Sequence, residues 1–329
     1  WWTSLASADF NGDGRPDYVA GNVGLNTPYH ADPAHPALLF AGRFASGGPP
    51  QIVEARYEGE VLHPLRPRNE LGTQIPVILK RFPKSDDYAR ASLADLLGSD
   101  RLAAARRYAA TELRSGVFLS QPGGGYRFEP LPRIAQIAPL QGIAAGDFDG
   151  DGHADIYAVQ NSFAPVPSVG RFDGGLSQLL AGDGRGHFQP VAPRTSGLVV
   201  RGDAKALAVL DLDADGWPDF LVSRNNESSL AWRNAGVAGR HSFRIRLHGK
   251  PGNPAAIGAA ITVKLADGTT QTAEIQAGGG YYSQSAPGCF FGYPEGNPAV
   301  SAEVRWPDGT VTSRSFSPPP TGTLTIAPQ

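Results

Sequence analysis

The sequence of 329 residues contains no methionine and one cysteine, Cys289. A single cysteine excludes an internal disulfide bond, so cysteine pairing gives no information about the redox compartment. No run approaches the roughly 20 consecutive apolar residues that a membrane-spanning helix needs, which excludes a transmembrane segment of this type. The motifs G-x-S-x-G, H-E-x-x-H and C-x-x-C and the phosphate-binding P-loop are also absent, so the most recognisable hydrolase, metalloprotease, redox and nucleotide sites are not present.

The charge balance has no dominant sign. The formal net charge is −2, from 29 basic and 31 acidic residues, which gives no overall attraction to nucleic acid or to an anionic membrane. Arg101, Arg106 and Arg107 are expected on a helix, where we interpret them as a solvated face rather than a nucleic-acid site. The chain begins Trp1-Trp2 without a methionine or a leader, so we expect a processed product or a fragment of a longer polypeptide.

An acidic nine-residue motif occurs three times, at residues 9–17, 147–155 and 211–219. Each copy has oxygen-bearing side chains at positions 1, 3, 5 and 9 and a glycine at position 6, where the chain must turn sharply. Alternate residues of such a loop can direct oxygens at one Ca²⁺ ion, and the backbone carbonyl of position 7 adds another ligand. The expected ligands are Asp9, Asn11, Asp13, Arg15 and Asp17; Asp147, Asp149, Asp151, His153 and Asp155; and Asp211, Asp213, Asp215, Trp217 and Asp219.

Calcium is the expected ion because the motif offers only oxygen ligands, and we expect about three sites with distances of about 2.3–2.6 Å. The motif is not an EF-hand, since it closes with Asp at position 9 and is flanked by sequences that favour strands. The alternative is a set of solvated Asp/Gly turns. Three copies in one register favour the metal.

The sequence predicts a repeating unit of strand, calcium turn and strand. Hairpins at 117–128 and 179–188 are expected to supply the outer strands, as in a four-stranded propeller blade. The interval between the first two motifs is about twice that between the last two, which predicts an insertion at about 60–115. It includes helices beginning near Ser85 and Ser99 and extending towards Leu113. Residues 43–54 are interpreted as a degenerate repeat whose turn, at Gly47 and Gly48, has lost its carboxylates.

Near residue 238 the sequence pattern changes. The residues that follow alternate between apolar and polar, as in β-strands, with an Asp267-Gly268 hairpin turn. We therefore expect a mainly β protein with two domains. Residues 1–238 would form a partial or incomplete β-propeller with a small helical insertion, and residues 239–329 a small β-sandwich or barrel.

The three acidic motifs resemble the FG-GAP/VCBS repeats of calcium-binding β-propellers. Residues 253–259, 278–284 and 305–309 resemble an ASPIC/UnbV domain, and the combination is similar to secreted bacterial proteins related to cartilage acidic protein. Two substitutions depart from the repeat, Asn11 for an acid at position 3 and Ala214 for glycine at position 4. Propellers of this family commonly have seven blades. The resemblance therefore implies that upstream blades, or another subunit, complete the ring.

Two functions follow as hypotheses. The first is a non-enzymatic, calcium-stabilised protein of the extracellular space, the cell surface or the periplasm, which acts in adhesion, ligand binding or assembly with a protein or glycan partner. The alternative is a polysaccharide-acting hydrolase or lyase, or its accessory subunit. For that role the insertion offers carboxylates and imidazoles that could act as acid and base: His30, His35, Glu54, Glu58 and His63.

Overall fold

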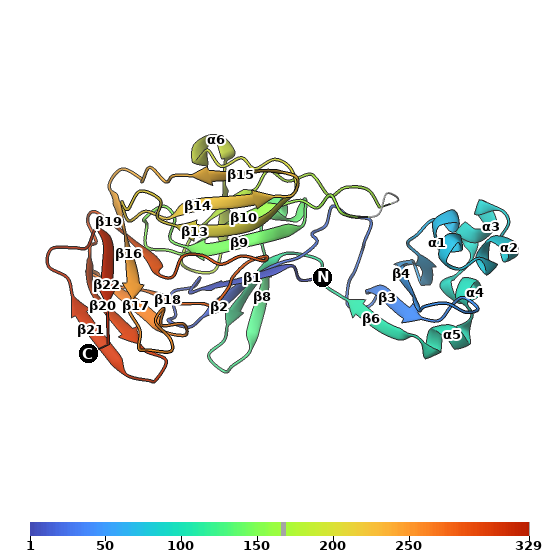
Figure 1. Ribbon diagram of the computed structural model, residues 1–329, viewed down its shortest axis with the longest axis horizontal. Helices are drawn as coiled ribbons and strands as arrows, with labels where there is room; N and C mark the ends of the chain where they lie inside the picture. The colour runs from blue at the N-terminus through green and yellow to red at the C-terminus, as the bar shows by residue number, and fades with distance from the viewer. Residues whose placement is uncertain (166–168, 329) are drawn as a thin grey trace. The chain divides into compact units, whose positions relative to one another are not determined.

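The computed structural model describes residues 1–165 and 169–328 and shows a mainly β protein with several small sheets and few helices (Figure 1). This confirms the predicted fold class. The chain divides into two compact units. The first consists of Trp1, Leu25–Leu113 and Phe163–Phe172, and the second of Trp2–Gly24, Arg114–Ser162 and Asp173–Gln329. The predicted domain boundary near residue 238 and the predicted limits of the insertion stay predictions.

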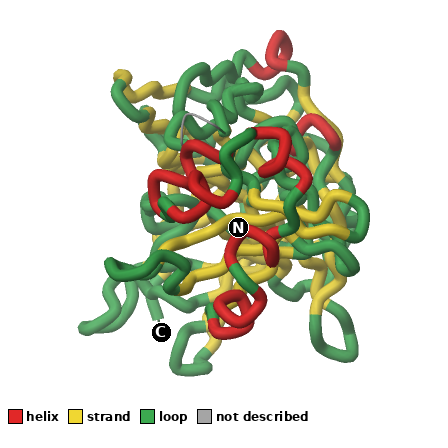
Figure 2. The backbone as a smooth tube through the Cα atoms, turned by 90° about the vertical axis from the view of Figure 1, so that its right-hand side faces the viewer, coloured by secondary structure: helices red, strands yellow, loops and turns green. Residues whose placement is uncertain are grey.

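One antiparallel sheet and a group of short helices form the core of the first unit. The sheet order is β5 (Val61–Pro64), β4 (Gln51–Glu58), β3 (Ala37–Gly42) and β6 (Arg106–Ala110). The helices are α1 (Arg68–Gln74), α2 (Val77–Arg81), α3 (Ser85–Arg90), α4 (Leu93–Leu97) and α5 (Ser99–Ala104). Phe40 and Val53 of the sheet pack in one core with Leu71 and Leu96 of the helices. Helices this short, red in Figure 2, owe their stability to such packing rather than to their own length.

The segment interpreted as a degenerate repeat has the expected strand, turn and strand. β3 and β4 pair from Leu38–Ala55 to Gly42–Gln51, and the turn lies between them. Gly47 and Gly48 have φ values of 84° and 85°, which glycine adopts without steric cost. These strands belong to the sheet of the first unit and do not join the sheets that carry the acidic motifs.

The helix prediction was wrong at its C-terminal end. Helix α5 ends at Ala104, and the chain then forms β6, which pairs with β3 along its whole length. Arg106 and Arg107, expected on a helix, therefore lie in a strand. The edge of β3 offers backbone hydrogen bonds to the chain, and local helix propensity does not compete with them. Helices α1 and α2 were not predicted.

Three sheets of the second unit each contain one acidic motif. The first sheet has the order β1 (Ser4–Ala8), β2 (Asp17–Gly21), β7 (Gly116–Ser120) and β8 (Tyr126–Pro130). The second has the order β12 (Phe188–Val191), β11 (Gln178–Gly182), β10 (Asp155–Gln160) and β9 (Leu140–Gly146). The third consists of β13 (Ala204–Leu210), β14 (Asp219–Arg224) and β15 (Glu227–Trp232). The predicted outer hairpins at 117–128 and 179–188 are thus the outer strand pairs of the first and second sheets.

The sheets follow one another through their first strands, since β1 contacts β9 and β9 contacts β13. Val19, Val117 and Ile156 belong to the core between the first and second sheets, and Tyr157 and Val222 to the core between the second and third. Strand β10 is buried along its entire length because both of its faces are covered.

The C-terminal segment forms a sandwich of two sheets, as predicted. One sheet has the order β19 (Cys289–Pro294), β16 (Arg240–Leu247) and β22 (Gly322–Ile326), with β22 parallel to β16. The other has the order β18 (Thr270–Glu274), β17 (Ala260–Leu265), β20 (Ala299–Arg305) and β21 (Val311–Ser315). Phe243, Phe291, Val263 and Trp306 join the two sheets in one core. Among the described residues, no helix is long and apolar enough to cross a membrane.

Candidate metal centres

Each acidic motif forms the turn between the first two strands of its sheet, and the register is identical in all three. The residue before the motif pairs with position 9, as Ala8–Asp17, Gly146–Asp155 and Leu210–Asp219. We call the turns loop 1 (9–17), loop 2 (147–155) and loop 3 (211–219). An identical register gives the three loops a common frame, so equivalent side chains can be compared directly.

The aspartate at position 9 is buried in every loop, and both of its oxygens accept backbone N–H groups. One N–H comes from position 2 of the same loop, and the other from the end of the third strand of the sheet. The donors and distances are Phe10 and Ser120 to Asp17 at 3.0 and 2.7 Å, Phe148 and Gly182 to Asp155 at 3.0 and 2.9 Å, and Leu212 and Asn234 to Asp219 at 2.7 and 2.7 Å. This residue fixes the loop to its own sheet.

Positions 1 and 5 bind the loop backbone in the same way in each copy. The position 1 carboxylate accepts the N–H of the position 6 glycine, at 2.9 Å in loop 1, 2.8 Å in loop 2 and 3.2 Å in loop 3. The position 5 carboxylate accepts the N–H of position 7 at 2.8–2.9 Å. Each loop backbone therefore curls around the aspartates at its positions 1 and 5. The backbone carbonyls of Arg15, His153 and Trp217 stay predicted Ca²⁺ ligands.

Positions 1, 3 and 5 converge in two of the loops. Asp147, Asp149 and Asp151 each offer a carboxylate oxygen within 4.8 Å of the others, and the same holds for Asp211, Asp213 and Asp215. Among the described residues, neither group includes the position 9 aspartate. These two clusters could hold a metal ion.

Loop 1 differs because Asn11 stands at position 3. Its amide donates to Asp13 at 3.0 Å, and the guanidinium of Arg15 lies 2.5 Å from the same carboxylate oxygen. Asp9 accepts three backbone N–H groups, from Gly12, Asp13 and Gly14. A cation in this loop would have to displace Arg15 from Asp13. Loop 1 is therefore the least suited of the three loops to bind a cation.

Loops 2 and 3 each contain four aspartates, and those of loop 2 are the more buried. Asp147 is 3% exposed, and burial, followed by the charges of Asp151 and Asp149, raises its pKa to about 7. Burial and the neighbouring charge of Asp147 raise the pKa of Asp155 well above its usual range. Arg240 of β16 lies 2.5 Å from Asp149 and 3.8 Å from Asp151. Arg240 offsets part of the repulsion among the loop carboxylates, at Asp149 and Asp151. A cation bound between positions 1, 3 and 5 would offset the repulsion at Asp147 as well.

Loop 3 contains a buried acceptor that the protein leaves unpaired. Oδ1 of Asp211 is inaccessible to solvent and has no hydrogen-bond partner among the described residues. Its other oxygen accepts from Gly216, and Arg233 lies 2.9 Å from Asp213. Buried polar atoms are almost always satisfied, and a cation between positions 1, 3 and 5 would satisfy this one.

Loop 3 also contains the second departure from the motif. Ala214 at position 4 has a φ of 63°, whereas Gly12 and Gly150 occupy the equivalent positions with φ values of 72° and 78°. The third loop thus keeps the backbone course of the other two at a residue that prefers another conformation.

Sequence reasoning missed the residues that complete the loops from a distance. Ser120 and Gly182 end the third strands of the first two sheets, Asn234 follows β15, and Arg240 comes from the C-terminal sandwich. The motif could not predict these residues. The first three act through their backbone N–H groups, which any residue has, and Arg240 belongs to a distant part of the sequence.

The residues considered for an enzyme are placed separately in the first unit. Tyr29 donates to Glu54 at 3.1 Å, and the ring of His35 lies 3.3 Å from Glu60. Glu58 and His63 line one pocket of about 420 Å³, which His30, His35 and Glu54 do not line. Among these five residues, that pocket brings together one carboxylate and one imidazole. Glu54 instead lies 3.6 Å from Arg66, which also lies 3.8 Å from Glu70.

Comparison with known proteins matches parts of the chain. The family model described as ASPIC and UnbV matches residues 249–329, which confirms the resemblance predicted there. The chain is also 26% identical over 203 residues to cartilage acidic protein 1 of Mus musculus, covering 59% of this chain and 30% of that protein. The same protein of Homo sapiens is 26% identical over 203 residues, with 59% and 29% covered.

The chain thus spans about three tenths of the length of these curated relatives. Among solved structures, the V. cholerae biofilm matrix protein Bap1 aligns over 96% of this chain and 49% of that chain, with 10% identity and a TM-score of 0.17. An alignment at this level supports no conclusion about the fold.

Proposed function

We propose that this chain is a non-enzymatic protein stabilised by Ca²⁺ at its three acidic loops. The observation that carries the proposal is the common hydrogen-bond pattern of the loops, in which position 9 fixes the turn, together with the convergence of positions 1, 3 and 5 in loops 2 and 3. All converging ligands are oxygens, and several are carboxylates, which suits Ca²⁺ better than metals that prefer nitrogen or sulfur.

The proposed architecture is a run of FG-GAP/VCBS-like propeller blades followed by the ASPIC/UnbV domain. It is supported by three sheets that each have an acidic turn between the first two strands and that follow one another through these strands. A location outside the cell, at the cell surface or in the periplasm is proposed because calcium is plentiful outside the cell and because the curated relatives are named for cartilage.

A partner that completes the blades is part of the proposal. The face of the first sheet that points away from the second carries five aromatic residues. Ring contacts of 5.0–6.2 Å join three of them, Trp2, Phe118 and Phe128, and a contact of 5.5 Å joins the other two, Tyr18 and Tyr126. Trp2 and Tyr126 are 50% and 51% exposed. We propose that another β-sheet, from elsewhere in the polypeptide or from another subunit, covers this aromatic face in adhesion or assembly.

The test is thermal unfolding of Asp151→Ala and Asp215→Ala with millimolar calcium and after metal depletion. At free calcium about 100-fold above the dissociation constant, each occupied site adds roughly 2.7 kcal/mol of stability. Both variants should lose most of one site's calcium-dependent gain and change little in metal-free buffer. Asp87→Ala, which removes an exposed acid of α3, is the control. Equal losses with and without calcium would refute the metal role.

A further inference from the structure

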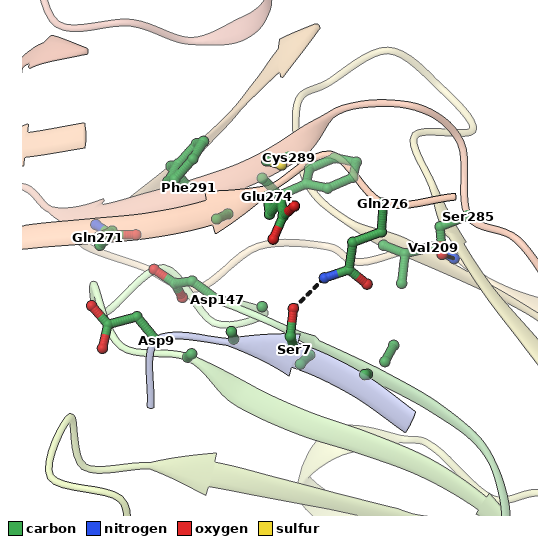
Figure 3. Close-up of a pocket in the computed structure, with 18 of the residues that line it drawn as sticks. Ser7, Asp9, Asp147, Val209, Gln271, Glu274, Gln276, Ser285, Cys289 and Phe291 are labelled. Atoms are coloured by element: carbon green, nitrogen blue, oxygen red, sulfur yellow. Dashed lines mark hydrogen bonds between the residues drawn. The ribbon is translucent and has the colours of Figure 1, made fainter. Parts of the chain in front are cut away.

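A cavity of about 180 Å³ lies in the second unit, between the first strands of the acidic-loop sheets and the C-terminal sandwich. Its walls come from β1, β9, loops 1 and 2, β18 and the segment 276–291. Figure 3 shows Glu274 and Gln276 pointing from the sandwich towards Ser7 of β1, with Asp147 on the same side as Ser7. Residues that are far apart in the sequence therefore meet around one cavity that is partly open to solvent.

The glycine-rich segment singled out in the sequence forms one wall of this cavity. Gly278 and Gly279 line it, and the segment is attached to the sheets at both ends. Gly280 N–H donates to Leu5 O at 3.0 Å, and Ala286 N–H donates to Val209 O at 3.0 Å. A wall fixed by backbone bonds to two different strands gives the cavity a defined shape, which a binding site needs.

The charged groups around the cavity disfavour anionic ligands. Among the described residues, Asp9, Asp147 and Glu274 line it, whereas no lysine or arginine does and His153 is its one basic residue. Glu274 is the lining carboxylate outside the acidic loops, so its charge is present whether or not these loops hold calcium. It has no ion pair within the described part of the chain.

The polar groups that face the cavity offer both hydrogen-bond acceptors and donors. The amide N–H of Gln276 donates to the hydroxyl of Ser7, and its oxygen, which has no partner among the described residues, is left to accept beside the carboxylate of Glu274. The hydroxyl oxygen of Ser285 accepts from Val209 N–H at 3.0 Å, so its O–H is left to donate. This set fits a ligand whose groups both donate and accept hydrogen bonds, as hydroxyl groups do.

The remaining wall is apolar. Ile143, Val209, Phe290 and Phe291 line it, and the aliphatic pair contacts C–H surface. A sugar ring combines hydroxyl groups on its rim with an apolar C–H face, and its size suits a cavity smaller than those that hold drug-sized ligands, which are roughly 300 Å³ or more. A simple ammonium ion could pair with the carboxylate and with an aromatic ring, but it would leave Ile143 and Val209 without C–H contact.

We propose that this cavity binds a neutral sugar ring, with Glu274 and Gln276 accepting its hydroxyl groups and the 278–286 segment closing over it. The inference adds a ligand class to the proposed binding role and rests on that role. It does not depend on calcium occupancy, since its central carboxylate lies outside the loops.

Saturation-transfer NMR with the full chain in calcium tests the proposal. The probes are galactose, glucose and N-acetylglucosamine as neutral sugars, galacturonate and glucuronate as acids, and glucosamine as a cation. At least one neutral sugar should bind, with the matching uronate at least tenfold weaker. Glu274→Gln, a change at an exposed position that preserves shape, should weaken the neutral sugar roughly tenfold, as expected for a hydrogen bond to a charged group, and should reduce the discrimination against uronate.

Glu303→Gln on β20 is the matched control, because it removes an exposed carboxylate of the same sandwich away from the cavity and should leave binding unchanged. Binding of glucosamine alone, binding of no probe, or equal binding by the Glu274 variant would each overturn the proposal. The calcium-dependent stability of Asp151→Ala is measured separately, so failure of sugar binding is distinguishable from failure of the calcium role.

Discussion

Aspartates of one motif carry out two different tasks. Those at positions 1, 3 and 5 face each other across the loop, and their mutual repulsion has to be relieved by a cation or by protonation. Those at position 9 are already satisfied by backbone N–H groups from two directions, as for Asp219 with Leu212 and Asn234 at 2.7 Å each. Positions 1 and 5 also accept N–H groups of their own loop, but among the described residues only position 9 accepts a backbone N–H from outside the loop as well. We therefore propose a division in the motif, in which position 9 holds the turn and positions 1, 3 and 5 bind the metal.

This division predicts that two substitutions in loop 3 lower the free energy of unfolding with a different dependence on calcium. Asp219→Asn should lower stability by about 1–3 kcal/mol both in calcium and in metal-free buffer, because it leaves one buried N–H without an acceptor. Asp215→Asn should lower stability only in calcium. Urea unfolding under both conditions measures the two values. A loss for Asp219→Asn that appears only in calcium would show that this residue acts chiefly as a ligand.

The carboxyl of Asp147 predicts a pH dependence. Its folded-state pKa of about 7 is raised by burial and by Asp151 and Asp149, whereas its unfolded value is about 3.9. The metal-free folded state binds more protons between these values, so its stability should fall as pH rises from about 4 to 7. Calcium needs the ionised carboxylate, so the calcium-dependent gain should grow over the same range.

Thermal unfolding at pH 5 and pH 8, with calcium and after metal depletion, measures this gain. Asp147→Asn should abolish most of its pH dependence, and Asp87→Asn should leave it intact. A calcium gain that is the same at both pH values would contradict the assignment of Asp147 as a ligand.

Residue patterns predicted the local part of the site and not the distant part. Convergence of Asp147, Asp149 and Asp151 follows from alternation within one turn, so nine residues of sequence contain it. The second partner of position 9 lies 103, 27 and 15 residues along the chain in loops 1, 2 and 3. Only the sheet order places it there, and no fixed spacing in the sequence could have revealed it.

Elements of the C-terminal sandwich press against loop 2. Gly292 of β19 has no room for a side chain, because a Cβ there would lie 2.3 Å from Oδ2 of Asp147 and 2.5 Å from Cα of Gly150. Gln271 of β18 also donates to Gly292 O at 2.6 Å. Within the second unit, loop 2 and the ASPIC/UnbV-matched segment are thus in direct contact, so the conformation of one depends on the other.

Gly292→Ala should therefore weaken calcium binding at loop 2 and lower stability, because either Asp147 or the backbone of Gly150 has to move. Gly296→Ala is the matched control in the following turn, where a Cβ would have no neighbour within 4 Å. Calorimetric titration of calcium should show one weakened site in the first variant and none in the second. Unchanged titrations for Gly292→Ala would mean that loop 2 tolerates the displacement or holds no metal.

Strand pairing also explains where the prediction of elements failed. The sequence after α5 favours a helix locally, yet β6 forms because Ala37–Ala41 of β3 offer a free edge to it. The outer hairpins of the first two sheets were predictable because glycine turns delimit them. The attachment of β7 to β2 across residues 25–113 was not, since the chain leaves the first sheet and returns to it.

At the scale of the whole molecule, the aromatic face of the first sheet is the surface that we propose a further sheet covers. Tyr18, Phe118 and Phe128 occupy one cross-strand row on that face, and the opposite face packs on the second sheet through Val19 and Val117. A sheet with apolar side chains on both faces is typical of a layer that packs between two other sheets. The second sheet covers one face of the first sheet, and the aromatic row lies on the other. Isolated exposed aromatics need no explanation, but five aromatic residues on one face form the kind of patch that marks a contact surface.

Hydroxyl-radical footprinting of Trp2 and Tyr126 tests this contact. We expect strong labelling in the recombinant 329-residue chain and at least severalfold protection in the protein purified from its native source, because an apolar layer would exclude solvent from both rings. Tyr282, which is 92% exposed and lies in the glycine-rich segment of the sandwich rather than on this face, serves as the internal reference. Equal labelling of Trp2 and Tyr126 in the two samples would show that the face is open to water in the native protein, and the proposed completion of the propeller by a further sheet would then be wrong.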